Sequence, residues 1–405
     1  MVLGVEGMYL TKEEERILGG EEGWAKAKAL EVIVKVGESL GAERLVNIEH
    51  AHISGVSYRN IGRHGEELIK SFADSGVRFS VKATVNPIGF DLEDPSSIPY
   101  ATIDEGYVRH QYNILTSLKA MGADLTLSCT PYYFPQVTSI KEGTSVAWGE
   151  SNAVLYANTV LGLKTNREGG PMSLMAAITG KTYYYGLHLE ENRVPRVEYV
   201  LDNKSNMDEA DYGVLGEIIA SIHEGINPPY LDVDLDEISL REFLAALGAA
   251  GNIAMVYING ITRGRVKKGE LKKEMIYRKE IESRREELGI KERPDLIYFG
   301  CPHAGVDDLR VIASQLKATK RKFDGKIVVT TSRDTIARLG KETIGILRNH
   351  GVRLIGDTCL VVSPFGYKGL RVATNSYKSL YYLSKRGIKV SLLSIRELKD
   401  VIEKW

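Results

Sequence analysis

Three cysteines are the residues of this chain whose type and position are best suited to chemistry. Cys129, Cys301 and Cys359 occur in the segments SCTP, GCPH and DTC, and each follows an apolar stretch that reads as a strand. Their odd number and wide separation argue against a disulfide framework. A zinc site, a catalytic thiol pair and an iron–sulfur cluster are the alternatives that three such thiols allow.

The alternatives make different demands on the sequence. Structural zinc usually takes four ligands from closely spaced pairs, which this sequence lacks. A cubane cluster held by three cysteines leaves one iron without a protein ligand. That iron could act as a Lewis acid that binds a substrate hydroxyl and eases its departure.

Further polar groups follow Cys129 within residues 125–171. The alternating apolar run at 123–127 predicts a strand that ends just before the cysteine. Glu150 and Ser151 then precede the run NAVLYANTVLGL, which predicts a buried helix capped by Ser151. Free amide groups at the start of a buried helix suit a carboxylate or a phosphate. A packed cysteine beside an ordinary helix cap is the alternative interpretation.

An alternation of strands and helices precedes this stretch and must position it. Strands are expected at 45–48, 77–85 and 123–127, with helices at 66–75 and 108–121 between them, which predicts a parallel sheet. Ligands bind outside the carboxyl ends of such strands. The segment from His52 to Ser57, the pair Asn86-Pro87 and Cys129 all come from those ends. His50 and His52 share one face, but no third ligand joins them, so a structural or substrate-contacting role is favoured over a metal site.

The remaining chain divides into a middle segment and a second regular part. Residues 171–294 change pattern, with an aromatic strand expected at 183–189 and another strand at 253–258. Strands at 296–299, 326–330, 353–355, 370–373 and 389–393 alternate with helices and predict a second parallel sheet, which delivers Cys301 and Cys359 at strand ends. We therefore expect an N-terminal α/β domain at 1–170, a middle domain or insertion at 171–294 and a C-terminal α/β domain at 295–405.

Composition limits the kinds of partner. Lysine plus arginine and aspartate plus glutamate both number 53, so no basic excess indicates nucleic acid. The charged stretch from 263 to 293 is interpreted as a solvated helical face. No apolar run approaches the roughly 20 residues that a membrane span needs, and no signal-like segment precedes the first charges. These features predict a cytoplasmic protein with reduced thiols.

The sequence also resembles a known family. The segments CTPYY, WGESNAVLYANTVLGLKTNREGGP, YYYGLHL and GCPH, together with DTC followed by TNSYK, resemble the aconitase X family over essentially the whole chain. The resemblance implies an aconitase-like α/β fold, with parallel sheets and flanking helices in two or three domains around a central cluster cleft. It also implies a hydro-lyase, because archaeal members dehydrate (R)-5-phosphomevalonate and bacterial members dehydrate cis-3-hydroxy-L-proline.

The same resemblance assigns roles to individual residues. It implies a 4Fe-4S cluster on Cys129, Cys301 and Cys359. It implies substrate contacts at Gly55, Val56, Ser57, Asn86, Pro87, Glu150, Ser151 and Lys378. In TNSYK, Tyr377 stands where a smaller residue is expected, which is a departure from the family pattern beside Lys378.

A partner is implied as well. Family members use a small swivelling domain, fused or separate, that brings the base. This sequence reaches Trp405 directly after the last expected strand and a terminal helix, so we expect a separate small subunit in a heterodimer and assign no base to this chain. A cis-3-hydroxy-L-proline dehydratase and a non-catalytic iron–sulfur or zinc-binding scaffold are the other readings.

Overall fold

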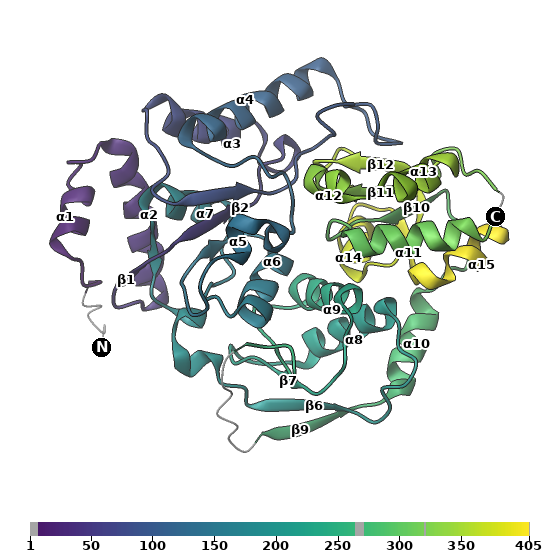
Figure 1. Cartoon of the computed structure of the whole chain (residues 1–405). Helices are drawn as coiled ribbons and strands as arrows, with labels where there is room; N and C mark the ends of the chain where they lie inside the picture. The colour runs from purple at the N-terminus through teal and green to yellow at the C-terminus, as the bar shows by residue number, and fades with distance from the viewer. Residues whose placement is uncertain (1–6, 264–270, 320, 405) are drawn as a thin grey trace.

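The computed structural model describes residues 7–263, 271–319 and 321–404, whose elements form three groups (Figure 1). In the first group, β2 lies between β3 and β4 in a parallel sheet, and β1 pairs antiparallel with β5. The elements of this group are α1 (Lys12–Leu18), α2 (Trp24–Leu40), β1 (Leu45–Asn47), β2 (His50–Ile53), α3 (Tyr58–Asp74), β3 (Lys82–Val85), α4 (Glu105–Met121), η1 (Pro131–Tyr133), α5 (Pro135–Thr138), β4 (Ala147–Trp148), α6 (Ser151–Tyr156), the π-helix η2 (Ala157–Leu161), α7 (Gly170–Thr179) and β5 (Lys181–Tyr183).

All three strands expected in this group differ from the structure. The strand at 45–48 forms as β1 but pairs antiparallel with β5, outside the parallel sheet, whose central strand is β2. The expected strand at 123–127 does not form; Asp124 makes only an isolated bridge to Thr84. Leu127 has a φ of 45°, which takes the backbone out of the extended region just before Cys129. The strand expected at 77–85 is confirmed only from Lys82, because Phe79 and Ser80 donate their amides to Met121 and Ala177 instead.

The second group is a parallel sheet of order β8-β7-β6-β9 covered by helices. Its elements are η3 (Gly186–His188), η4 (Glu190–Arg193), β6 (Val197–Leu201), α8 (Glu209–Ile222), β7 (Tyr230–Leu231), α9 (Glu237–Ala250), β8 (Tyr257–Ile258), β9 (Lys272–Ile276) and α10 (Arg278–Leu288). Figure 1 shows α8 and α9 on the side of this sheet that faces the other two groups. The strand expected at 253–258 is confirmed only at its last two residues.

Other expectations for this segment were also partly wrong. The aromatic strand expected at 183–189 ends at Tyr183 and continues as the short helix η3. Strand β5 pairs with β1, and α7 packs against α2, so elements beyond residue 170 lie with the N-terminal group. In the charged stretch, residues 264–270 lie outside the described ranges and Lys272–Ile276 pairs with β6 as a strand. The expected solvated helical face is confirmed only in α10, where Ile281 alone is buried.

The third group is a parallel sheet of order β12-β11-β10-β13-β14, and this confirms the second predicted sheet. Its elements are β10 (Leu296–Phe299), α11 (Val306–Lys317), β11 (Ile327–Thr331), α12 (Arg333–Arg338), α13 (Lys341–Asn349), β12 (Arg353–Gly356), β13 (Arg371–Thr374), α14 (Tyr377–Ser384), β14 (Lys389–Leu392), η5 (Ile395–Glu397) and α15 (Leu398–Glu403). Strands β10 and β11 are buried along their whole length, and separate apolar cores lie on the two sides of the sheet.

The fold is therefore α/β, with several parallel sheets and flanking helices, as expected. The three groups share one apolar core, which contains Val154 of α6, Leu247 of α9 and Leu380 of α14. Among the described residues, no helix is both long and apolar enough to cross a bilayer.

Candidate functional site

The three cysteines, which come from two different groups of elements, are brought together by His303. Its backbone N–H donates to the Cys129 sulfur at 3.3 Å, and Cys301 lies two residues before it in the chain. Its ring joins Ser128 Oγ at 3.2 Å and the Thr358 carbonyl at 2.9 Å, next to Cys129 and Cys359 respectively. One buried histidine thus ties together the three loops that carry the thiols.

The electrostatics of the thiols agree with this arrangement. All three are buried. Burial and the nearby Glu150 carboxylate raise the pKa of Cys129 to about 12. The interaction between the Cys301 and Cys359 thiols raises the pKa of Cys301 and lowers that of Cys359. The three thiols are therefore close enough to influence one another's charge.

These thiols are the side chains that could hold a metal centre. Among the residues that the structure describes, no three His, Cys, Asp or Glu side chains surround one point as the ligands of a single ion would. A cluster distributes its cysteine ligands over several iron atoms, so it needs sulfurs ranged around a wider centre. Three buried thiols on neighbouring loops fit that donor set better than a mononuclear zinc site.

A polar network lies beside the thiols. Lys378, in α14, donates to Glu150 and to Asn152 Oδ1, the latter at 2.6 Å. Asn152 Nδ2 in turn donates to the Cys129 carbonyl at 2.9 Å, and Asn86 Nδ2 donates to Glu150 Oε2 at 2.7 Å. A lysine of the third group is thereby joined to a carboxylate and two amides of the first.

The network fixes the charges of its two ionisable members. Burial raises the pKa of the Glu150 carboxyl, but the Lys378 charge and the hydrogen bonds from Lys378 and Asn86 outweigh this effect and lower the pKa to about 2. Burial lowers the pKa of Lys378, and the Glu150 charge reverses the shift and holds the pKa above 10.5. Near neutral pH the pair is therefore an ionised carboxylate and an ammonium group in a site of low dielectric.

The two remaining substrate segments approach the same region. Gly55 adopts a φ of 65°, which suits the turn between β2 and α3. Ser57 Oγ donates to the Val362 carbonyl at 2.7 Å, three residues beyond Cys359. The loop after β3, with Asn86 and Pro87, continues to Ile88, whose N–H donates to the Asp357 carbonyl at 2.9 Å. Both segments thus pack against the Cys359 loop.

Glycines hold the turn and α6 in place. A Cβ on Gly149 would lie 2.6 Å from Ser54 Oγ, and one on Gly248 would lie 3.2 Å from Ser151 Cβ. The β4–α6 junction can therefore pack closely against both the turn and α9. This close packing turns Glu150 and Ser151 toward the interior.

One expected role is wrong and several partners were missed. Ser151 does not cap α6; Glu150 is the N-cap residue and makes no side-chain cap bond, while Ser151 Oγ donates to Glu150 Oε1 at 3.3 Å. Asn152 and His303 went unrecognised as site residues, although both stand inside the segments WGESNAVLY and GCPH that drew attention to the site. Their partners lie far away in sequence, so no local pattern identifies them.

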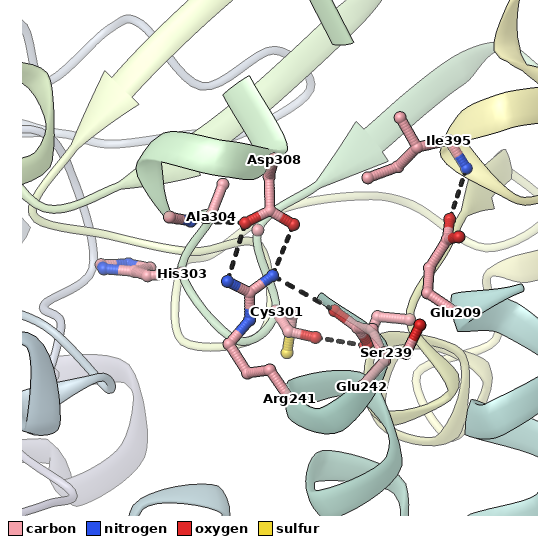
Figure 2. A network of polar contacts seen from close by, with 12 residues as sticks. Glu209, Ser239, Arg241, Glu242, Cys301, His303, Ala304, Asp308 and Ile395 are labelled. Carbon is pink, nitrogen blue, oxygen red and sulfur yellow. Dashed lines mark hydrogen bonds and ion pairs between the residues drawn. The ribbon is translucent and has the colours of Figure 1, made fainter. Parts of the chain in front are cut away.

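A buried ion pair behind Cys301 was also missed. Figure 2 shows Arg241 reaching from α9 to Asp308 in the first turn of α11, with nitrogen–oxygen distances of 2.7 and 2.5 Å. Asp308 also accepts the Gly305 N–H at 2.7 Å, which fixes the end of the loop that carries Cys301 and His303. Burial raises the pKa of the neighbouring Glu242 to about 8, so that carboxyl is largely protonated at neutral pH.

Comparison with known proteins gives consistent matches along the chain. The aconitase X first, second and third domains match residues 7–191, 194–288 and 294–404. A phosphomevalonate dehydratase large subunit from Aeropyrum pernix is 50% identical over 403 residues, which cover 98% of this chain and 100% of that protein. The corresponding protein of Thermococcus kodakarensis is 36% identical, with 96% and 99% covered.

Two further matches are a solved structure and a dehydratase with a different substrate. The crystal structure of aconitase X from Thermococcus kodakaraensis in its holo-form has a TM-score of 0.87 and 37% identity, and covers 97% of this chain and 100% of that one. A cis-3-hydroxy-L-proline dehydratase from Pseudomonas aeruginosa is 28% identical over 93% of this chain, but the match covers only 66% of that protein.

Proposed function

This chain belongs to the aconitase X family, and we propose that it is the large subunit of a phosphomevalonate dehydratase, a hydro-lyase that converts (R)-5-phosphomevalonate to trans-anhydromevalonate 5-phosphate in a mevalonate route to isoprenoids. The 50% identity to the Aeropyrum pernix large subunit, over the full length of that protein, carries the proposal. The hydroxyproline dehydratase from Pseudomonas aeruginosa is matched over only 66% of its length, which makes that reaction the less favoured one.

We propose that Cys129, Cys301 and Cys359 hold a 4Fe-4S cluster. Their burial and the hydrogen bonds of His303, which join the loops that carry them, support this assignment. When bound, such a cluster supplies a Lewis-acidic iron that draws charge from the hydroxyl that leaves.

The polar network would bind and orient the substrate. Lys378 brings a positive charge that suits a carboxylate or a phosphate. Asn86 and Glu150 present a donor and an ionised acceptor, and Ser151 lies against the same carboxylate. The turn at Gly55, Val56 and Ser57 and the loop at Pro87 close the other side of the proposed substrate site. Because these groups are buried and already hydrogen-bonded, they would orient the substrate without reorganisation.

No side chain in this network suits removal of the proton next to the carboxylate. A general base works best when its pKa lies near the working pH. The Glu150 carboxyl, with a pKa of about 2, is too weak a base near neutrality. We therefore propose that a small subunit with a swivelling domain supplies the base, in a cytoplasmic heterodimer whose reduced thiols favour that compartment.

The test is anaerobic purification of this chain with its small subunit, followed by assays with (R)-5-phosphomevalonate and with cis-3-hydroxy-L-proline. We expect the unsaturated phosphate product from the first substrate, detected by ³¹P NMR, together with iron and sulfide in equal amounts. Dehydration of hydroxyproline alone would favour the other reaction, and zinc without turnover would favour a scaffold.

Two variants separate the cluster from general packing. Cys301→Ala should lose iron, sulfide and turnover together. Thr358→Val is the matched control, because the Thr358 hydroxyl is buried beside Cys359 but makes no hydrogen bond. It should keep both cluster and activity, and full activity in Cys301→Ala would refute the assignment.

A further inference from the structure

His52 is fully buried at the edge of the proposed substrate site, and both of its ring nitrogens are hydrogen-bonded. It projects from β2, where it stands opposite Thr84 of β3. Nδ1 lies 2.8 Å from Thr84 Oγ1, and Nε2 lies 2.7 Å from Asn86 Oδ1. Burial lowers the pKa of His52 to about 4, so the ring is neutral and carries one proton on one nitrogen.

The neighbouring carboxylate decides which nitrogen carries that proton. Asn86 has one acceptor oxygen and one donor NH₂ group, which must face opposite partners. Glu150 is ionised and can only accept, so the NH₂ group must face it, as the 2.7 Å contact of Asn86 Nδ2 has it. Asn86 Oδ1 is then turned toward His52, and this requires a proton on Nε2. Nδ1 accepts from the Thr84 hydroxyl.

We infer that His52 is a positioning residue for the dehydration: its Nε2–H fixes the Asn86 amide with the NH₂ group toward Glu150, and so holds the substrate-facing carboxylate in place. This inference rests on the proposed function only in that Asn86 and Glu150 meet the substrate. His52 itself makes no hydrogen bond to Glu150 or to a cysteine in the described structure; it acts through Asn86.

The orientation set by His52 continues into the rest of the network. With Asn86 held, Glu150 Oε2 accepts one hydrogen bond from the amide and Oε1 is left for Lys378. Lys378 then donates to Asn152 Oδ1, which turns the Asn152 NH₂ group toward the Cys129 carbonyl. A flipped Asn86 would point its carbonyl oxygen at the ionised Glu150 carboxylate, which is repulsive. The first hydrogen bond of the series that runs from Asn86 through Glu150 and Lys378 would then be lost.

The first experiment needs no turnover. The whole chain, with its small subunit, is labelled with ¹⁵N in its histidine rings, and His52 is assigned by comparison with His52→Gln. The ¹⁵N shifts report which ring nitrogen carries the proton. We expect a neutral ring protonated on Nε2 across pH 6 to 8. A ring protonated on Nδ1, or one that titrates in this range, would overturn the inference.

The second experiment compares three variants in the complete enzyme. His52→Gln keeps an amide N–H near the position of Nε2 and should stay within about threefold of the wild-type kcat/KM. His52→Leu loses that donor and should lower kcat/KM by about 10- to 100-fold. Thr84→Val is the matched control, because it removes the other buried hydrogen bond of His52 and leaves the Asn86 contact intact. It should lose stability but stay within about threefold of wild type in kcat/KM.

The outcomes are separable. Equal losses in Thr84→Val and His52→Leu, or a His52→Gln variant as slow as His52→Leu, would show that His52 only packs the core. If His52→Leu does not fold, the His52→Gln and Thr84→Val variants and the ring shifts still decide. If the wild-type pair does not dehydrate phosphomevalonate, the proposed function fails, while the ring shifts still test the orientation of Asn86.

Discussion

His52 and His303 have different roles in this site because each of their ring nitrogens has a defined hydrogen-bond partner. In His303, Nε2 faces a carbonyl and must donate, so Nδ1 accepts from Ser128, and burial keeps the ring neutral by lowering its pKa to about 4. The ring therefore acts as a fixed brace between the loops of Cys129 and Cys359.

Loss of that brace should release the metal centre. We expect His303→Leu to lower the iron content of the purified chain several-fold, because removing a side chain that hydrogen-bonds to a metal ligand typically lowers metal affinity by about 10- to 100-fold. Iron and sulfide analysis measures the effect. His188→Leu is the control, since His188 is equally buried and also contacts a serine, Ser145, at 3.1 Å, but does not contact the cysteine loops. Equal iron in the two variants would contradict the role of His303.

A buried carboxyl away from the thiols should give the chain a recognisable pH dependence. Burial raises the pKa of Glu168 from 4.5 to about 7, although Tyr183 and Thr182 donate to it at 2.9 and 3.2 Å. Below pH 4.5 the carboxyl is protonated in both states, so its contribution to stability is complete. As the pH rises from 4.5 to 7, the unfolded state ionises first and the folded state loses stability relative to it.

The measurement is urea unfolding of the wild type and Glu168→Gln at pH 5 and pH 8. The wild type should lose about 3 kcal/mol more than the variant between the two limits of this titration, since each pKa unit corresponds to about 1.4 kcal/mol. Parallel stability curves for the two proteins would rule out a raised pKa at this carboxyl.

At the scale of secondary-structure elements, helices position the loop that carries Cys301. Helix α9 crosses to the start of α11 through Arg241 and Asp308, both nearly inaccessible to solvent, and α11 follows directly on the loop with Cys301 (Figure 2). Breaking a buried ion pair leaves one charge without compensation, which is far more costly than losing an exposed pair.

We therefore expect Arg241→Met to destabilise the chain by about 3–5 kcal/mol and to reduce cluster content, because Asp308 would be left charged and buried. Thermal and urea unfolding, together with iron analysis, measure the two effects. Arg310→Met, on the helix α11 that carries Asp308, is the control. Arg310 and Asp307 form a pair at 3.2 Å with both side chains exposed. That variant should change stability by about 1 kcal/mol or less, and a similar loss in both would contradict the argument.

Helices and strands could be predicted from the sequence where the local pattern of apolar and polar residues determines them. The five strands of the C-terminal sheet were expected from apolar runs, and all five are confirmed; β10 and β11, inside the sheet, are buried along their whole length. The run at 123–127 has the same alternation as a strand, but Leu127 is left-handed. Thr126 also meets Val85 of β3 through its side-chain hydroxyl, so no continuous ladder of backbone bonds forms. The aromatic run ending in η3 is broken by Gly186, whose φ of 60° no strand accommodates.

The contacts of the site were not predictable in the same way. The segments that carry Cys129, Glu150 and Lys378 were recognisable because they are long and specific. The hydrogen bonds of Lys378, however, reach Glu150 and Asn152, which lie 228 and 226 positions away in the chain. Which nitrogen of His52 carries a proton likewise depends on a carboxylate that the sequence places 98 residues away. Such dependence appears only after folding.

At the scale of the whole molecule, the site belongs to all three groups of elements, while the proposed proton acceptor does not belong to the chain. The thiols come from the first and third groups, and α9 of the second supports the loop that carries Cys301. We expect the isolated chain to bind iron and phosphomevalonate but to turn over negligibly until the small subunit is added. Titration of the small subunit into the loaded chain, with product followed by ³¹P NMR, measures this dependence. Turnover by the chain alone at the rate of the pair would refute it.

The main-chain pairing between Ile88 and the Asp357–Thr358 segment has a consequence for how the substrate arrives. Ile88 lies in the loop after β3 and Thr358 in the loop after β12, so moving the N-terminal and C-terminal sheets apart would break backbone contacts beside Cys359. In the proposed heterodimer, the large subunit would therefore stay closed at this point, and the small subunit would open and close the substrate site. Turnover should then follow the rate at which the small subunit exchanges.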